Sequence, residues 1–360
     1  MSSFSNSKIN PFHGYFLCMS AMFTLTQISA VVILIEDAKR DAFISTIFGC
    51  MAYFLYAYWI YRIVNNLTPN QSFLNVLEHK MGFWVAWTVR CWIALFLFCE
   101  LFVVHKNIVT WVKSMIIPFT PIWAISLPLL IVCSYLAVKG IKPIAITFSV
   151  LLPVLLILIL FMSLFTLKFR QIDILLPLIS EGAEPILKGT VTTFRAGMEL
   201  FFLVLLSPHI QGKFKWKHLT IVLSIVSVVF VNGIVSLLTT FGPYEASKQR
   251  FPLFTQWRLV SISSFVEHLD FLSMYQWLSN TTILISMGLF LFGDLLTSKQ
   301  LHKKIAIVTL TAILFICVEL HINDSVFLTF TKIYYYPLSS LSILCWTVLA
   351  YLVTRKRGLS

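Results

Sequence analysis

The sequence predicts an all-α, polytopic membrane protein with ten transmembrane helices. Of its 360 residues, 58% are hydrophobic and only 12% are charged, whereas soluble domains are about 45–50% apolar and about 25% charged. The apolar residues form continuous runs of about twenty residues, the length of helix that crosses a bilayer. These runs do not alternate with polar residues, so helices are favoured over a transmembrane β-barrel.

Apolar windows bounded by charged residues, proline or asparagine give the spans in order. The first half of the chain contributes five, at 14–35, 43–61, 83–104, 121–138 and 144–167. The second half contributes five more, at 191–210, 218–240, 271–293, 304–321 and 335–354. No connection is long or polar enough to form a soluble domain, so we expect 1–360 to be one integral membrane domain.

The ten spans divide into two sets of five, in 1–167 and 190–360. Because five is an odd number of crossings, the second set enters the membrane from the opposite side, as in inverted-repeat transporters. In that architecture spans one and six correspond, and both are interrupted near the middle of the membrane, where they bind the substrate. The sequence therefore predicts a 5+5 inverted-repeat, transporter-like fold.

The basic residues favour one orientation. With a cytoplasmic N-terminus, fourteen of the 27 Lys and Arg residues fall on inner loops, including the clusters "KFKWKH" and "TRKRG". The positive-inside rule then places both termini in the cytoplasm. The net charge of +12 is spread over loops, so we expect the lipid bilayer as a partner and no nucleic acid.

Motifs for catalysis, metals and cofactors are missing from the sequence. The seven cysteines lie in or beside apolar runs without a C-x-x-C pair, which is typical of small buried hydrophobic residues. There is no H-E-x-x-H and no G-x-S-x-G motif. We therefore expect no enzyme activity, no metal site and no cofactor.

Polar residues interrupt the first and sixth spans at corresponding places. The first carries "TLTQ", with Thr24, Thr26 and Gln27, and the sixth carries "RAGMEL", with Arg195, Gly197 and Glu199. We expect these interruptions to face each other across a ligand site. The alternative is a continuous helix in which the threonine hydroxyls bond carbonyls one turn back.

Glu199 carries the strongest signal for a site. A charged side chain at the bilayer centre costs about 2.5–3.5 kcal/mol, and Glu199 lies about 12 Å into the sixth span at 1.5 Å per residue. We expect Glu199 to accept a hydrogen bond from a ligand ammonium, and Gly197 to let the backbone approach the ligand. Arg195 would act as its charge partner or gate the site. The alternatives are a packing carboxylate for Glu199 and a snorkelling side chain for Arg195.

Two further spans add candidate ligand-binding residues. Glu100 lies in the third span, and Thr281 and Thr282 follow Asn280 in the eighth. The alternatives are snorkelling for Glu100 and hydrogen bonds between helices for the eighth-span cluster. A lining of hydroxyl and backbone groups suits a small zwitterion.

Three segments show a resemblance to a known family: "TPIWAISLPLLIVCSYLAVKGIKPIAI", "ILLPLISEGAEPILKGTVTTFRAGMELFFLVLLSPHI" and "FGPYEASKQRFPLFTQWRLVSISSFVEHLDFLSMYQW". They resemble the B subunit of GerA-type spore germination receptors, the endospore germination permease family. The resemblance implies the amino acid–polyamine–organocation transporter superfamily, with helices one and six broken around a small nutrient. It also implies the inner membrane of the spore, and receptor A and C subunits as partners.

The predicted function is therefore nutrient sensing: a small amino-acid-like germinant binds between helices one and six and shifts them. The alternative is an active secondary transporter for amino acids, coupled to protons through Glu199 or Glu100. Both functions need the same pocket, and only the resemblance favours sensing.

Overall fold

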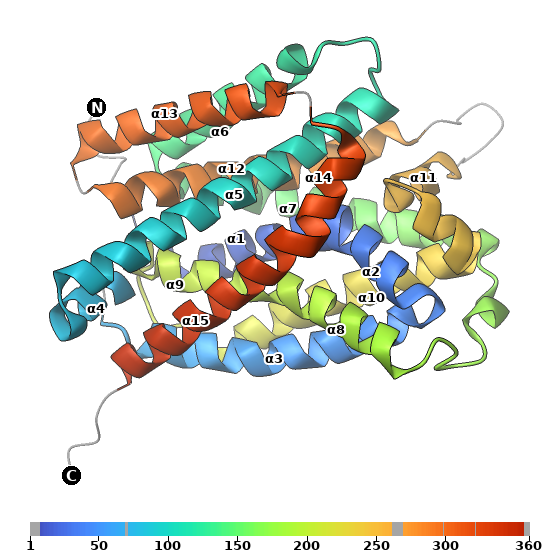
Figure 1. Cartoon of the computed structure of the whole chain (residues 1–360), viewed down its shortest axis with the longest axis horizontal. Helices are drawn as coiled ribbons and strands as arrows, with labels where there is room; N and C mark the ends of the chain where they lie inside the picture. The colour runs from blue at the N-terminus through green and yellow to red at the C-terminus, as the bar shows by residue number, and fades with distance from the viewer. Residues whose placement is uncertain (1–7, 69–70, 261–268, 298, 321, 356–360) are drawn as a thin grey trace.

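The computed structural model describes residues 8–68, 71–260, 269–297, 299–320 and 322–355, and these fold into one bundle of long helices (Figure 1). The described residues of the first half form α1 (Pro11–Thr24), η1 (Leu25–Ala30), α2 (Val31–Ala38), η2 (Lys39–Asp41), α3 (Ala42–Asn66), α4 (Phe73–Met81), α5 (Phe83–Met115), α6 (Ile122–Lys139), α7 (Ile141–Thr166), η3 (Leu167–Phe169) and η4 (Ile172–Leu175). Those of the second half form α8 (Ala183–Gly197), η5 (Met198–Phe201), α9 (Phe202–Leu206), η6 (Ser207–His209), α10 (Trp216–Lys248), α11 (Pro252–Arg258), α12 (Phe271–Leu296), α13 (Gln300–Glu319), α14 (Asp324–Phe330), η7 (Thr331–Tyr335) and α15 (Tyr336–Thr354).

Nine helical stretches of the described chain are long and apolar enough to cross a membrane. The first, Pro11–Asn66, has 56 residues and would be about 84 Å long as a straight helix, whereas the hydrocarbon core is about 30 Å thick. The chain turns back within it at Lys39, whose φ is +47°. The stretch therefore makes two crossings, and the described residues make ten in all, as predicted.

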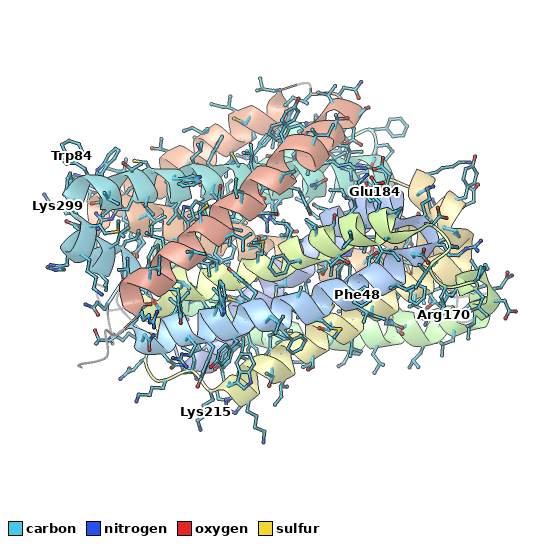
Figure 2. The ribbon with its side chains drawn as sticks, turned by 60° about the horizontal axis from the view of Figure 1, so that its bottom comes forward. Phe48, Trp84, Arg170, Glu184, Lys215 and Lys299 are labelled. Atoms are coloured by element: carbon cyan, nitrogen blue, oxygen red, sulfur yellow. The ribbon has the colours of Figure 1, made fainter. Side chains whose placement is uncertain are left out.

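The helix ends alternate between the two faces of the bundle. Figure 2 shows Trp84 and Lys299 at one end and Arg170 and Glu184 at the other. Trp84 lies in the first turn of α5 and Glu184 in the first turn of α8. These two helices therefore enter from opposite sides, because the chain makes three crossings, α5, α6 and α7, between the start of α5 and the start of α8.

The first and sixth crossings form the centre of the bundle. Their most apolar windows are 94% and 83% buried, against 22% for α6 and α13, which lie together at one edge (Figure 1). The central position follows from sequence, because α1 and η1 contain no charged Asp, Glu, Lys or Arg residue and their few polar residues form no solvent-facing side, and a helix without a polar face is buried. The polar groups of these two crossings therefore lie inside protein.

Asp41, in the turn after α2, holds the segment that connects α7 to α8 through hydrogen bonds. Its side chain is fully buried and accepts hydrogen bonds from the backbone N–H groups of Ile179 (3.0 Å) and Glu181 (2.9 Å). Lys39 of the same turn pairs with the Glu181 carboxylate at 3.2 Å. The first turn and the link from α7 to α8 are thus held as one unit.

Candidate functional site

The first crossing changes its helical register where the sequence reads "LTQISA". Leu25–Ala30 is π-helical, and all six residues are buried. The flanking Thr24 and Val31 keep right-handed helical dihedral angles. The prediction that helix one is broken and unwound is therefore wrong. This stretch contains neither proline nor glycine, so the backbone stays helical and accommodates one extra residue in a π turn. Such π segments are frequent at functional sites.

The threonine hydroxyls of this segment bond within their own helix. Thr24 Oγ1 donates to the carbonyl of Ser20 at 2.9 Å, and Thr26 Oγ1 donates to the carbonyl of Phe23 at 3.2 Å. This is the alternative arrangement, with hydroxyls satisfied one turn back. The polar groups of the segment that reach other helices are Gln27 and Ser29, whose hydroxyl accepts from Asn107 Nδ2 of α5 at 3.2 Å.

The sixth crossing also changes register, from α8 through the 3₁₀ segment η5 to α9. Here too the backbone stays helical, so the prediction of a broken helix six is wrong. A Cβ built on Gly197 would lie 2.3 Å from Tyr53 Cβ. The side chain of Tyr53 on α3 therefore fills the space in which the sequence analysis expected a ligand, and Gly197 allows the two helices to pack closely.

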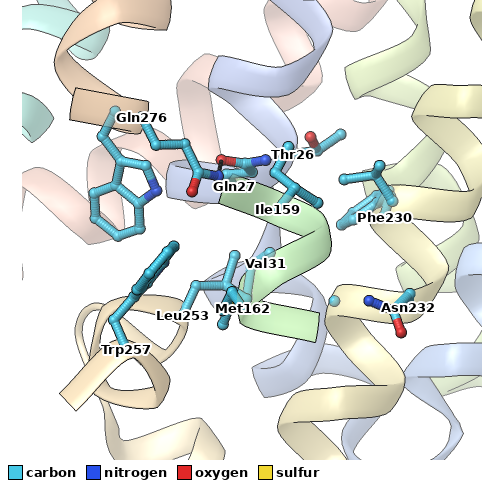
Figure 3. Close-up of a pocket in the computed structure, with 13 residues that line it drawn as sticks. Thr26, Gln27, Val31, Ile159, Met162, Phe230, Asn232, Leu253, Trp257 and Gln276 are labelled. Carbon is cyan, nitrogen blue, oxygen red and sulfur yellow. Dashed lines mark hydrogen bonds between the residues drawn. The ribbon is translucent and has the colours of Figure 1, made fainter. Parts of the chain in front are cut away.

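A small cavity lies against η1, between α7, α10, α11 and α12 (Figure 3). Its volume is about 40 Å³, room for about three water molecules at 10–15 Å³ each. The lining residues share a lack of formal charge: they are Thr26, Gln27, Val31, Ile159, Met162, Val229, Phe230, Asn232, Gly233, Leu253, Trp257, Gln276 and Trp277. The cavity therefore suits a ligand with little net charge and an apolar part.

Two glutamines form the polar end of this cavity. Gln276 Nε2 donates to Gln27 Oε1 at 2.8 Å, and Figure 3 shows the two amides turned toward each other. Gln276 is 4% exposed, and its Oε1 has no partner among the described residues. The pair thus offers a free amide oxygen, while the amide nitrogen of Gln27 is not used in this bond. A ligand with one donor and one acceptor group matches them.

A separate ionic cluster lies between α5, α8–η5 and η7–α15. Arg195 donates to Glu100 Oε2 at 3.0 Å and to Ser339 Oγ at 2.7 Å, and it also pairs with Glu199. Tyr335 donates its hydroxyl to Glu100. Arg195 and Glu199 are 1% exposed and Glu100 is fully buried, so none of the three snorkels to water.

The cluster holds two carboxylates for one guanidinium. Glu100 Oε1 and Glu199 Oε2 are buried without a hydrogen-bond partner in the described chain. The Arg195 guanidinium also lies 5.9 Å from the ring centre of Phe96 and 5.7 Å from that of Tyr336. These contacts join three crossings through one buried arginine. Neither Arg195 nor the two glutamates line the cavity at η1.

The eighth-span residues serve contacts between helices. The carbonyl of Thr282 accepts from Cys133 Sγ at 3.6 Å, which joins α12 to α6. Thr281 is fully buried, and its hydroxyl has no partner within the described part. Ser20 donates to the carbonyl of Asn280 at 3.2 Å, which joins α1 to α12. Neither Thr281 nor Thr282 lines the cavity.

The structure therefore separates the predicted residues into three groups. Thr26 and Gln27 line the cavity, while Glu100, Arg195 and Glu199 form the ionic cluster. Gly197 and Thr282 lie at contacts between helices, Thr24 bonds within its own helix, and Thr281 is buried. Sequence reasoning missed the cavity residues Gln276, Asn232 and Trp257 and the cluster residues Tyr335 and Ser339. One signal was available, because Gln276 lies one turn before Asn280 on the same face of a helix.

Comparison with known proteins decides the family. The model of the spore germination protein family, Spore_permease, matches residues 8–327. The chain belongs to this family. Its members are permease-like or receptor-like membrane proteins and do not form an enzyme class, and this germination protein is accordingly a multi-pass membrane protein.

Curated relatives agree with this assignment. Spore germination protein XB of Bacillus anthracis is 30% identical over 327 residues, which cover 90% of this chain and 91% of the relative. Spore germination protein KB of Bacillus subtilis is 22% identical over 277 residues, covering 74% and 72% of the two chains. Spore germination protein YndE of Bacillus subtilis is 28% identical over 178 residues, or 47% of each chain.

A solved structure identifies the fold. MhsT, crystallised in complex with L-phenylalanine, superimposes with a TM-score of 0.65, covering 97% of this chain and 96% of that chain at 12% identity. At this identity the likeness concerns the fold alone. The germination protein therefore has the all-α, ten-helix, inverted-repeat transporter fold that the sequence predicted.

Proposed function

We propose that this germination protein is the nutrient-sensing membrane subunit of a spore germination receptor, and that it binds a small amino-acid-like germinant in the cavity at η1. The observation that supports this most is the amide pair of Gln27 and Gln276 at one end of a cavity whose walls are mostly apolar. An α-amino acid carries an ammonium donor and a carboxylate acceptor on one carbon. The free Gln276 amide oxygen can accept a hydrogen bond from the ammonium group, and the Gln27 amide nitrogen can donate one to the carboxylate.

The remaining walls favour an apolar side chain on the ligand. Trp257 and Leu253 line the cavity across from the amides (Figure 3). Because the cavity is only about 40 Å³, a small amino acid such as L-alanine needs the least opening of the site. The germinant site therefore lies around helix one, as the sequence analysis proposed, with Thr26 and Gln27 retained from its set of residues.

Binding can be measured on the purified chain through tryptophan fluorescence, because Trp257 and Trp277 line the cavity. We expect L-alanine to change the emission saturably, and its methyl ester and N-acetyl derivative not to do so. Gln276→Leu removes a hydrogen bond to a charged group, which is worth about 1.5–3 kcal/mol, or about ten- to a hundredfold in affinity. Gln300→Leu, at an exposed glutamine on α13, is the matched control. Equal affinity of the Gln276→Leu variant and the parent chain would refute the site.

An active, proton-coupled amino acid transporter is the second candidate. It is favoured by the buried carboxylates Glu100 and Glu199, each with one unpartnered oxygen in the described chain, since membrane carboxylates commonly carry protons. Proteoliposomes that contain only this chain, with an imposed proton gradient, separate the candidates. Accumulation of labelled L-alanine would establish transport, and binding without accumulation would favour sensing.

The partners and location follow from the proposed role. We propose that the chain works with the A and C subunits of a germinant receptor in the inner membrane of the spore, with both termini cytoplasmic. The family assignment supports the receptor, and the basic clusters "KFKWKH" and "TRKRG" support the orientation. Co-purification of A and C subunits with a tagged chain from spore membranes tests the assembly, and protease protection of a C-terminal tag tests the orientation. The halves 1–167 and 190–360 are proposed as the two repeats that move against each other.

A further inference from the structure

A second cavity, of about 390 Å³, opens sideways on the bundle surface between α1, α7 and α10. Phe12 and Ile221 on its rim are each 48% exposed. Other lining residues include Phe16 and Met19 of α1, and Leu156 of α7. The lining is almost entirely apolar, and it lies along membrane-spanning helices. We call this cavity the lateral groove.

The sequence of α7 explains why the groove exists. Ser149 and Pro153 both line it and lie one helical turn apart, so two short side chains face the groove where larger ones would fill it. On α10 the lining residues His218, Ile221 and Ile225 recur at the same helical spacing. Each helix thus gives the groove one continuous face.

The groove starts at the membrane surface and reaches deep into one leaflet. Its lining begins at Phe12 and His218, in the first turns of α1 and α10. Its deepest lining residue on α7, Leu156, lies about 22 Å from the start of that helix at 1.5 Å per residue. One leaflet of the hydrocarbon core is about 15 Å thick. Each helix lines the groove over seven residue steps, about 10 Å at 1.5 Å per residue, so the groove takes the larger part of one acyl chain.

Basic residues surround the open end of the groove. Lys142 lies in the first turn of α7, while Lys215 and Lys217 lie at the start of α10, and Figure 2 shows Lys215 at the edge of the bundle. The segments 1–35, 101–172 and 200–244, which supply the three helices, contain no acidic residue. Nothing in these segments offsets the positive charge, so the open end is complementary to an anionic headgroup.

We propose that the lateral groove binds an anionic glycerophospholipid, with one acyl chain between α1, α7 and α10 and the phosphate against Lys142 and Lys217. The acyl chain alone gives little preference, because lipid tails are as apolar as the groove walls. The headgroup charge therefore decides which lipid binds. This inference does not depend on the nutrient or on the function proposed above.

A lipid in this position supports the half of helix one that precedes η1. That half is already tied to the start of α10, where the Tyr15 hydroxyl donates to the carbonyl of Lys215 (3.0 Å) and accepts from its N–H (2.8 Å). An acyl chain beside Phe16 and Met19 would fill the remaining open side of this half. Loss of the lipid should therefore loosen α1 without removing any residue of the η1 cavity.

Native mass spectrometry of the detergent-purified full chain tests the proposal, with phosphatidylglycerol and phosphatidylcholine of identical acyl chains as probes. We expect phosphatidylglycerol to bind more tightly, and Lys142→Gln/Lys217→Gln to reduce that preference by about fivefold for each lysine. Lys80→Gln/Lys299→Gln removes the same charge from two exposed lysines outside the groove lining and should leave the preference unchanged. Lys80 lies in the last turn of α4 and donates to the carbonyl of Val353 (2.6 Å), and Lys299 lies at one end of the bundle (Figure 2).

Two further experiments distinguish the contribution of the lipid acyl chain from that of the headgroup. Ser149→Phe fills the groove and should weaken the binding of both lipids, while circular dichroism confirms that the helices remain. Glycerol 1-phosphate, which has the anionic group without the chain, should not displace phosphatidylglycerol. Equal binding of the two lipids to the parent chain, an unchanged preference in Lys142→Gln/Lys217→Gln, or displacement by glycerol 1-phosphate would each overturn the proposal.

Discussion

Arg195→Gln is the substitution for which the structure predicts the largest loss of stability. The arginine is the one guanidinium between Glu100 and Glu199, and all three side chains are at most 1% exposed. Its removal leaves two buried carboxylates close together without their shared cation. The neutral glutamine keeps hydrogen-bonding capacity but cannot offset either charge.

The expected magnitude follows from the burial of the cluster. Breaking a buried ion pair by removing one partner costs about 3–5 kcal/mol, because the other charge remains desolvated. At about 2.1 cal/mol/K per residue, the 360-residue chain has an unfolding entropy of about 0.76 kcal/mol/K. The melting temperature should therefore fall by about 4–7 °C.

The assay is thermal unfolding of purified variants in one detergent, followed by intrinsic fluorescence. Arg195→Gln/Glu199→Gln removes one of the stranded carboxylates and should recover part of the loss. The matched control is Lys188→Gln, which breaks the Glu184–Lys188 pair (2.7 Å), another i,i+4 pair on the same helix but one exposed to solvent; we expect no measurable shift. An unchanged melting temperature in Arg195→Gln, or no recovery in the double variant, would refute the reasoning.

Two further predictions concern packing and the link between the halves. Gly197→Ala places a Cβ 2.3 Å from Tyr53 Cβ and should lower the free energy of unfolding by about 1–3 kcal/mol in the same assay. The control Gly233→Ala, whose Cβ would have its nearest atom at 3.8 Å, should leave it unchanged. Equal stability of the two variants would contradict the packing argument. Asp41→Ala removes the acceptor of two backbone N–H groups in the link between α7 and α8, so limited proteolysis should cut that link faster; an unchanged cleavage rate would show that the carboxylate does not hold it.

The membrane crossings could be predicted from the sequence because apolar length is a strong signal. The eighth span, expected at 271–293, is α12 at Phe271–Leu296, and the fourth, expected at 121–138, is α6 at Ile122–Lys139. The short helix α4 was not predicted, since nine residues are too few to show a period. The polar stretches "TLTQ" and "RAGMEL" predicted the places of the two register changes, η1 and η5. They did not predict their kind, because a π turn requires neither proline nor glycine.

Only those contacts of the candidate site that join neighbouring residues of one helix could be predicted from the sequence. Arg195 and Glu199 are four residues apart on one helix, so their pairing follows from the sequence. Their third partner, Glu100, lies 95 positions away, and helical periodicity gives the face of a residue without giving the helix opposite it. The same limit separates Gln27 from Gln276, which meet across 249 positions.

The placement of the two polar sites indicates which part of the bundle a germinant would move. The ionic cluster joins α5, η5 and α15 through one arginine, so these helices form a fixed frame. The cavity joins η1 to α12 through the single hydrogen bond between Gln27 and Gln276, which contributes only about 0.5–1.5 kcal/mol net. A zwitterion that engages both amides competes with that bond, and a ligand shifts a conformational equilibrium only through such a difference in affinity. Under the proposed function, η1 can therefore move away from α12 on binding, while the bond from Ser20 to the carbonyl of Asn280 keeps α1 on α12 and the arginine keeps helix six in place.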